Sequence, residues 1–213
     1  MATDAQALTL MQWLSPAYPL GSFAYSHGIE AAVAGGHVRD AVTLRDWIAD
    51  VLTHGSGRSD AVLMRLAHAP DADVAALDAV ARAYAPAAER LREGARQGAA
   101  FARTTRAVWG IDLPDLMLPV AMGRAARLMS LDIDLAVPMA LHAFAANLVS
   151  CAQRLLPLGQ TAAQRIVADL IDPCRAVAAA TRGTTADDLW SVAWMSDIAA
   201  MRHETLQPRI FQS

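Results

Sequence analysis

The chain has 213 residues, a length that fits one domain or one large helical bundle. Its net charge of −3 and its pI of about 6.0 give no bulk attraction to nucleic acid or to an anionic membrane, so neither is an expected partner. All 18 basic residues are arginine, which excludes a Schiff-base lysine and the lysine of a phosphate-binding P-loop.

Apolar residues at helical spacing, separated by glycine and proline, predict about eight to ten helices and no strand. The third helix has the clearest apolar stripe, and Thr43 is expected to cap it. Gly94 and Gly98 lie inside a long helix, where close packing against a neighbour is the expected reason for glycine. In chain order the expected helices span residues 4–14, 22–35, 43–54, 59–69, 73–84, 86–109, 114–130, 134–160, 161–181 and 185–201, with interruptions at Pro119 and Pro173.

The stretch 134–160 reads DLAVPMALHAFAANLVSCAQRLLPLGQ, and between residues 135 and 149 its only strongly polar side chains are His142 and Asn147. A helix that is apolar all round is buried, either in a membrane or in the middle of a bundle. A membrane span needs about 20 predominantly apolar residues, and Pro138, His142 and Asn147 interrupt this run. The sequence therefore predicts a single-domain all-α bundle built around this central helix.

The cysteine content and the first residues predict an intracellular protein. Cys151 and Cys174 lie far apart and form no CxxC motif, so they are expected to be reduced thiols in the core. The N-terminal segment lacks the basic region of a signal peptide. The expected location is therefore the cytoplasm.

Motifs for catalysis or metal binding are weak in this sequence. The six histidines form neither HxxxH nor HExxH, and no cysteine lies at ligand spacing from them, so no closed metal site is expected. Ser26, His27 and Glu30 lie within about one helical turn, but a helical serine has no nucleophile elbow and no oxyanion donors. His142 is expected to be a core or interface residue. The polar end of the chain, residues 202–213, would either fray or become ordered on a partner.

Three segments carry a recognisable combined pattern: LMQWLSPAYPLGSFAYSHGIE (residues 10–30), NLVSCAQRLLPLGQTAAQ (147–164) and DIAAMRHETLQPRIFQS (197–213). Together they resemble the UreF family of urease accessory proteins, whose members have an SPxFPxGxFxxSxGLE pattern, a PLGQ stretch and an MxHExxYSRLFRS type of ending. The segments RQGAAFAR (96–103) and PVAMG (119–123) also fit. The order and spacing of the segments match across nearly the whole chain.

The resemblance implies an all-α protein without enzymatic activity or a cofactor of its own. Such proteins form homodimers and bind the accessory protein UreD, which is also called UreH. Together these would recruit the GTPase UreG and load nickel into apo-urease. Because this chain has no P-loop lysine, the nucleotide chemistry would belong to the partner, and whether an arginine of this chain assists it stays open.

The resemblance also implies a bundle of residues 1–201 followed by a partner-binding tail of residues 202–213. The GTPase-facing surface would contain Arg154 and a helix face with Phe23, Tyr25 and Glu30. The UreD-facing tail would use His203, Glu204, Arg209, Ile210 and Phe211, and His142 would lie near the dimer contact. The chain departs from the family ending at Gln207, Pro208 and Gln212, which favours a more extended tail and puts a tail arginine contact in doubt.

Two other functions stay open from the sequence. One is a small-molecule or metal-binding helical bundle with hydrolase activity, which would bind nickel tightly alone or turn over a substrate. The other is a helical adaptor unrelated to nickel, whose deletion would leave urease activity unchanged.

Overall fold

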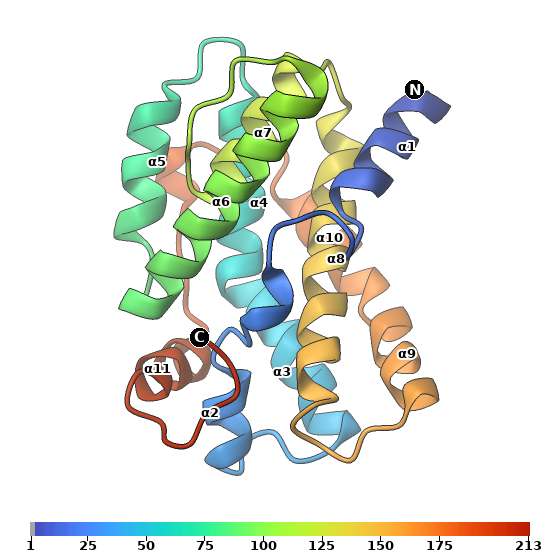
Figure 1. The fold of residues 1–213 in the computed structure, drawn as a ribbon, viewed down its shortest axis with the longest axis vertical. Helices are drawn as coiled ribbons and strands as arrows, with labels where there is room; N and C mark the ends of the chain where they lie inside the picture. Colours follow the sequence, from blue (N-terminus) through green and yellow to red (C-terminus); the bar gives the residue numbers. More distant parts are fainter. Residues whose placement is uncertain (1–2) are drawn as a thin grey trace.

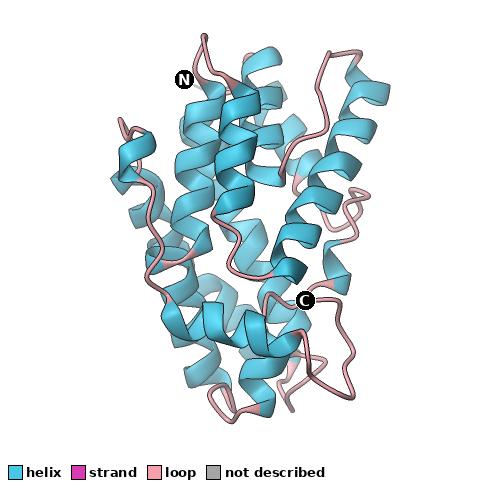
Figure 2. Ribbon diagram, turned by 90° about the vertical axis from the view of Figure 1, so that its left-hand side faces the viewer, coloured by secondary structure: helices cyan, strands magenta, loops and turns pink. Residues whose placement is uncertain are grey.

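The computed structural model describes residues 3–213 and folds them into eleven α-helices and two short 3₁₀ helices, with no strand in that range (Figures 1 and 2). The prediction of an all-α bundle is confirmed. In chain order the elements are α1 Asp4–Trp13, η1 Ser22–Ala24, α2 Ile29–Ala34, α3 Ala41–His54, α4 Ser56–His68, α5 Val74–Ala83, α6 Ala88–Trp109, α7 Leu118–Leu128, α8 Ile133–Ala152, α9 Gln160–Asp169, α10 Ile171–Ala180, η2 Ala186–Asp188 and α11 Trp194–His203.

Helix α8 lies in the middle of the bundle (Figure 1), where it contacts α3, α4, α7, α9 and α10. Val137, Leu141, Ala145 and Leu148 recur every three or four residues along α8 and are buried. With a mean hydropathy of 1.6, α8 is the one helix between residues 3 and 213 that is long and apolar enough to cross a membrane. Its contacts, which also include α1 and α2, place α8 at the centre of the bundle, as the sequence predicts. The expectation that α8 is buried all round is wrong, because only one stripe of it is buried and its other side lines a groove.

The prediction of a single helix over residues 22–35 is wrong. The structure has η1 and α2 instead, separated by an extended Tyr25. His27 and Gly28 have φ angles of 57° and 79°, and this left-handed conformation cannot continue a right-handed helix. Three of the expected partner-binding residues therefore do not share one helix face: Phe23, Tyr25 and Glu30.

Several other helix boundaries differ from expectation. The helix expected over residues 134–160 ends at Ala152, and the one expected over 185–201 is replaced by η2 and α11. Asp40 rather than Thr43 caps α3, because the Asp40 carboxylate accepts a hydrogen bond from the Thr43 main-chain N–H at 2.8 Å. Pro119 lies in the first turn of α7, where proline is tolerated, and does not break it. Residues 161–181 form two helices that meet at Leu170, since Pro173 lies in the first turn of α10.

Glycine allows two close approaches in the bundle. A Cβ atom on Gly98 would lie 1.9 Å from the main-chain oxygen of Leu116, and one on Gly123 would lie 2.2 Å from that of Met64. The lack of a side chain at Gly98 therefore lets the segment before α7 pack closely against α6. The lack of one at Gly123 lets α4 pack closely against α7. The close packing expected at Gly98 is confirmed.

Aromatic contacts hold the N-terminal segment against α6. The rings of Trp13 and Phe101 meet edge to face, with centroids 5.1 Å apart. The hydroxyl groups of Tyr18 and Thr105 are hydrogen-bonded at 2.8 Å in the interior. These contacts anchor the loop that leads into η1.

Both cysteines are free and buried, as the sequence predicts for core thiols. Burial raises the pKa of Cys151 and of Cys174 to about 11. The reactive thiolate form is therefore scarce at neutral pH.

Candidate functional site

The last ten residues pack against the bundle instead of fraying. After α11 the chain turns back, and its end lies beside α2 and the segment before it (Figure 1). The main-chain N–H of Gln212 donates to the Ala24 oxygen at 2.8 Å, and the Ser26 N–H donates to the Ser213 oxygen at 2.8 Å. Phe211 is 3% exposed. We refer to residues 204–213 as the tail.

Glu30 receives the tail with a buried carboxylate. Its Oε1 accepts the main-chain N–H of Ile210 at 2.6 Å, and its Oε2 accepts that of Phe211 at 2.9 Å. Oε2 also lies 3.0 Å from Nε2 of His203 at the end of α11. Hydrogen bonds to an ionised carboxylate are among the stronger ones in proteins, so Glu30 fixes the tail and α11 together.

His203 is fully buried between two carboxylates. Its Nδ1 lies 2.6 Å from Oε2 of Glu89, opposite the contact to Glu30. His203 therefore joins α2, α6 and α11 through its two ring nitrogens.

Two glutamates of α6 complete this cluster and were not predicted. Glu89 Oε1 accepts a hydrogen bond from Arg209 at 2.5 Å, and Glu93 Oε2 accepts one from the Ser213 hydroxyl at 2.5 Å. Both are buried, and with Gln97 and Phe101 they follow a four-residue spacing along the inner face of α6. That spacing was the sequence feature from which the inward orientation of Glu89 and Glu93, though not their partners, could have been predicted. We call the following residues the tail clamp: Ser26, Glu30, Glu89, Glu93 and His203.

Glu204 ties the start of the tail to the start of α6. Its Oε1 accepts the main-chain N–H groups of Ala88 at 2.7 Å and of Glu89 at 3.3 Å. The N-cap residue of α6 is Ala87, which has no side-chain acceptor of its own. A tail residue therefore supplies the cap of a helix more than a hundred positions earlier in the chain.

Acidification is expected to loosen the tail. Burial alone would raise the pKa of Glu89, but hydrogen bonds from His203 and Arg209 outweigh it and hold the pKa below the ordinary value of 4.5. A carboxyl with a lowered folded-state pKa stabilises the fold above the unfolded-state value, and this contribution disappears as the pH falls through the lowered pKa. The main-chain amide chemical shifts of Ile210 and Phe211, followed by NMR from neutral pH to about 3, should move toward unfolded values below about 4.5.

The variant Glu89→Gln provides the comparison for that titration. It lacks the titrating group, so its tail should be less firmly held at neutral pH and should show a smaller change on acidification. Tail amide shifts that stay constant in the wild-type chain until the whole bundle unfolds would contradict the role given to Glu89.

The expected GTPase-facing residues come together in part. Phe23 is 69% exposed on η1, and its main-chain oxygen accepts a hydrogen bond from Arg154, which is exposed just after α8. The Arg154 guanidinium also lies 4.0 Å from the centroid of the Phe211 ring, a cation–π distance. Tyr25 and Glu30 are buried beneath this group. Of the expected tail residues, His203 and Phe211 are buried, whereas Glu204, Arg209 and Ile210 are exposed.

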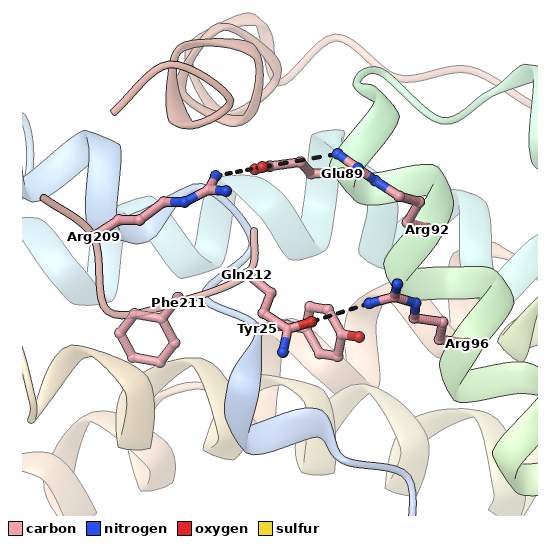
Figure 3. Close-up of a pocket in the computed structure, with 7 residues that line it drawn as sticks. All are labelled: Tyr25, Glu89, Arg92, Arg96, Arg209, Phe211 and Gln212. Carbon is pink, nitrogen blue, oxygen red and sulfur yellow. Dashed lines mark hydrogen bonds and ion pairs between the residues drawn. The ribbon is translucent and has the colours of Figure 1, made fainter. Parts of the chain in front are cut away.

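Three arginines surround a hollow of about 360 Å³ between α6 and the tail (Figure 3). Arg92 and Arg96 lie one turn apart on α6, and Arg209 approaches from the tail. Glu89 lies between Arg209 and Arg92, whose Nη2 is 3.9 Å from Oε1 of Glu89. We call this feature the arginine hollow. Its other lining residues are Tyr25, Phe211 and Gln212.

A larger, mainly apolar groove of about 980 Å³ follows the uncovered side of α8. Residues of α1, η1 and α10 form its walls, among them Met11, Phe23 and Ile171. His142 is half-buried and lines the groove. We call it the α8 groove.

Helix α11 exposes an apolar stripe that the sequence did not predict. Its buried residues are mostly small or polar and recur at helical spacing, namely Ser196, Ala199, Ala200 and His203. Larger apolar side chains point outward, so the helical pattern looks weak in the sequence. We call these exposed residues the α11 stripe: Trp194, Met195, Ile198 and Met201.

The serine and histidine beside Glu30 do not form a catalytic relay. The Ser26 hydroxyl donates to the main-chain oxygen of Ser213 at 2.5 Å, and His27 Nε2 lies 2.8 Å from the Ser56 hydroxyl. Burial, and secondarily the charge of Arg90, hold the pKa of His27 well below its ordinary value. Across residues 3–213, no group of three or more His, Cys, Asp or Glu side chains is arranged to hold a metal ion.

Comparison with known proteins connects this geometry to one family. The family model described as UreF matches residues 38–171. The chain is 49% identical to the urease accessory protein UreF of Roseobacter denitrificans, an alignment that covers 100% of this chain and 96% of the relative. It is 54% identical to that of Cereibacter sphaeroides and 53% identical to that of a Ruegeria species, each over 99% of this chain and 100% of the relative.

Proposed function

The chain belongs to the UreF family of urease accessory proteins, and on that premise we propose that it is a non-enzymatic scaffold for nickel insertion. In this proposal it acts in the cytoplasm with UreD, also called UreH, to recruit the GTPase UreG to apo-urease. It carries no cofactor of its own, and the GTPase performs the nucleotide chemistry.

The observation that carries this proposal is the tail clamp, because it supports exposed residues on two sides. Phe23, Arg154 and the α6 side of the arginine hollow form the proposed GTPase-facing surface, while Arg209, on the tail side of the hollow, is shared with the UreD-facing surface. Tyr25 and Glu30 belong to this surface as buried supports: Tyr25 lines the hollow, and Glu30 holds the tail in place.

The α11 stripe, together with the exposed tail residues, forms the proposed UreD-facing surface. Trp194 is 66% exposed beside other exposed apolar side chains of α11, and Ile210 is 65% exposed; grouped apolar side chains of this kind are typical of a partner interface. Glu204 and Arg209 would contribute polar contacts at the same end of the chain. His203 and Phe211 act from the interior by fixing the position of these residues.

The α8 groove is the proposed homodimer contact, with His142 in its wall. A mainly apolar, uncovered groove along the core helix suits the self-complementary contact of a two-fold dimer. The dimer would then hold two GTPase molecules in a fixed relative orientation. That arrangement gives the scaffold its mechanism, since the nucleotide state of both copies can act on one nickel transfer.

The test is to mix the chain with the UreD and UreG proteins of the same source and to measure the mass of the assembly by light scattering. We expect a complex with UreD alone, and a larger complex with two copies of each protein when UreG is added. Elution of the chain as an isolated species in both mixtures would contradict the proposal. Deletion of the gene without loss of nickel-dependent urease activity would contradict it independently.

A further inference from the structure

The arginine hollow has more positive charge than the chain itself neutralises. It contains three guanidinium groups, from Arg92, Arg96 and Arg209, and a single carboxylate, from Glu89. Glu89 already accepts hydrogen bonds from Arg209 and from His203, one on each oxygen. Two positive charges therefore remain in excess around the hollow, and the one carboxylate present has little capacity left for them.

Two of the three arginines of the hollow are held in place before any ligand arrives. Arg209 is fixed by Glu89, and Arg96 donates to the Gln212 side chain at 3.2 Å. Figure 3 shows Arg92 and Arg96 on the α6 side and Arg209 on the tail side, with Tyr25 and Phe211 below them. Donors that are already positioned lose less side-chain entropy on binding, which raises affinity.

The size and shape of the hollow indicate which anion fits. Planar guanidinium forks match the two oxygens of a carboxylate or of a phosphate group. At about 360 Å³ the space is several times larger than a free inorganic anion, and it is partly open to solvent. The hollow suits an acidic residue of a protein partner, because both its carboxylate and part of its backbone can enter the space.

We propose that the arginine hollow binds the carboxylate of an aspartate or glutamate side chain on the docked GTPase. The inference rests on the proposed function, because it assigns a contact within the GTPase-facing surface. The carboxylate pairs with Arg92 and Arg96, while Arg209 stays paired with Glu89 and contributes its charge. The same oxyanion chemistry could come from a phosphate of the nucleotide on the GTPase, and the experiment separates these two sources.

The experiment measures the affinity of the complex of this chain with UreD for UreG, in the presence of GDP and separately of a non-hydrolysable GTP analogue. In the double variant Arg92→Gln with Arg96→Gln, the dissociation constant should rise about tenfold or more with either nucleotide, the order expected for loss of a charge-assisted pair. The salt dependence of binding should also become weaker, because fewer charges are paired across the interface.

The matched control is Arg103→Gln with Arg127→Gln, which removes the same two charges from exposed positions on α6 and α7, outside the hollow. It should leave the dissociation constant within about twofold of the wild-type value. Both substituted arginines of the hollow are exposed, so their double variant should keep its fold, which circular dichroism and thermal unfolding check.

Three results would overturn the inference. Wild-type affinity of the double variant would show that the hollow takes no anion from the GTPase. A loss of affinity seen only with the GTP analogue would assign the arginines to a phosphate of the nucleotide. Failure of the wild-type complex to bind UreG at all would show that the proposed function fails, and the inference would fall with it.

Discussion

Replacing Glu30 with alanine is expected to release the tail from the bundle and to lower the free energy of unfolding by about 3–5 kcal/mol. The substitution removes a buried carboxylate that accepts hydrogen bonds from Ile210, Phe211 and His203. It leaves His203 with one carboxylate partner in the interior, and two tail amides lose their acceptors. Chemical denaturation followed by circular dichroism measures the loss, and hydrogen exchange at the Ile210 and Phe211 amides reports release of the tail.

Two variants separate this effect from a change of surface charge. Glu30→Gln keeps the side-chain shape and one acceptor oxygen but loses the negative charge, so its stability should lie between those of the alanine variant and the wild type. Asp172→Asn removes a carboxylate whose side chain is 88% exposed and should change little. Unchanged protection of both tail amides in Glu30→Ala would refute the tail clamp as the origin of tail order.

Replacing Trp194 with alanine is expected to weaken binding to UreD by about thirtyfold, which corresponds to about 2 kcal/mol, while leaving the stability of the isolated chain unchanged. Trp194 is 66% exposed in this chain, so its truncation removes little intramolecular packing. An exposed tryptophan beside other apolar side chains is typical of residues that dominate the energy of an interface. Isothermal titration of UreD into each variant measures the change.

The control for Trp194→Ala is Val42→Ala on α3. Val42 is 63% exposed and lies outside the α11 stripe, so it should bind UreD with wild-type affinity. If Trp194→Ala also binds as tightly as the wild type, UreD does not use the α11 stripe, and the proposed UreD-facing surface is reduced to the tail.

The core of the fold could be predicted because it depends on local patterns. An uninterrupted apolar run specified α8, and breaks at glycine and proline delimited most of its neighbours. The errors lie where one residue has an unusual backbone conformation. Nothing in the residue types of His27 and Gly28 requires both to adopt positive φ, although that conformation divides the expected second helix.

The candidate site could be predicted only as a set of segments. Family resemblance selected residues 10–30 and 197–213, and the structure brings these two regions together through Glu30, Ser26 and the tail. Glu89 and Glu93 could not be assigned in the same way, because charged residues on a helix are usually exposed. Their burial depends on partners that lie more than a hundred positions away, and periodicity within α6 carries no information about those partners.

The cap that Glu204 supplies to α6 couples local unfolding of the first turn of α6 to release of the tail. The first turn of α6 and the tail share hydrogen bonds, so neither can detach without removing acceptors or donors from the other. Residues 88–93 and 204–213 should therefore open as one cooperative unit, with a common free energy of local unfolding. Partner binding at either segment would slow the local unfolding of both, which couples the middle of the chain to its C-terminal end.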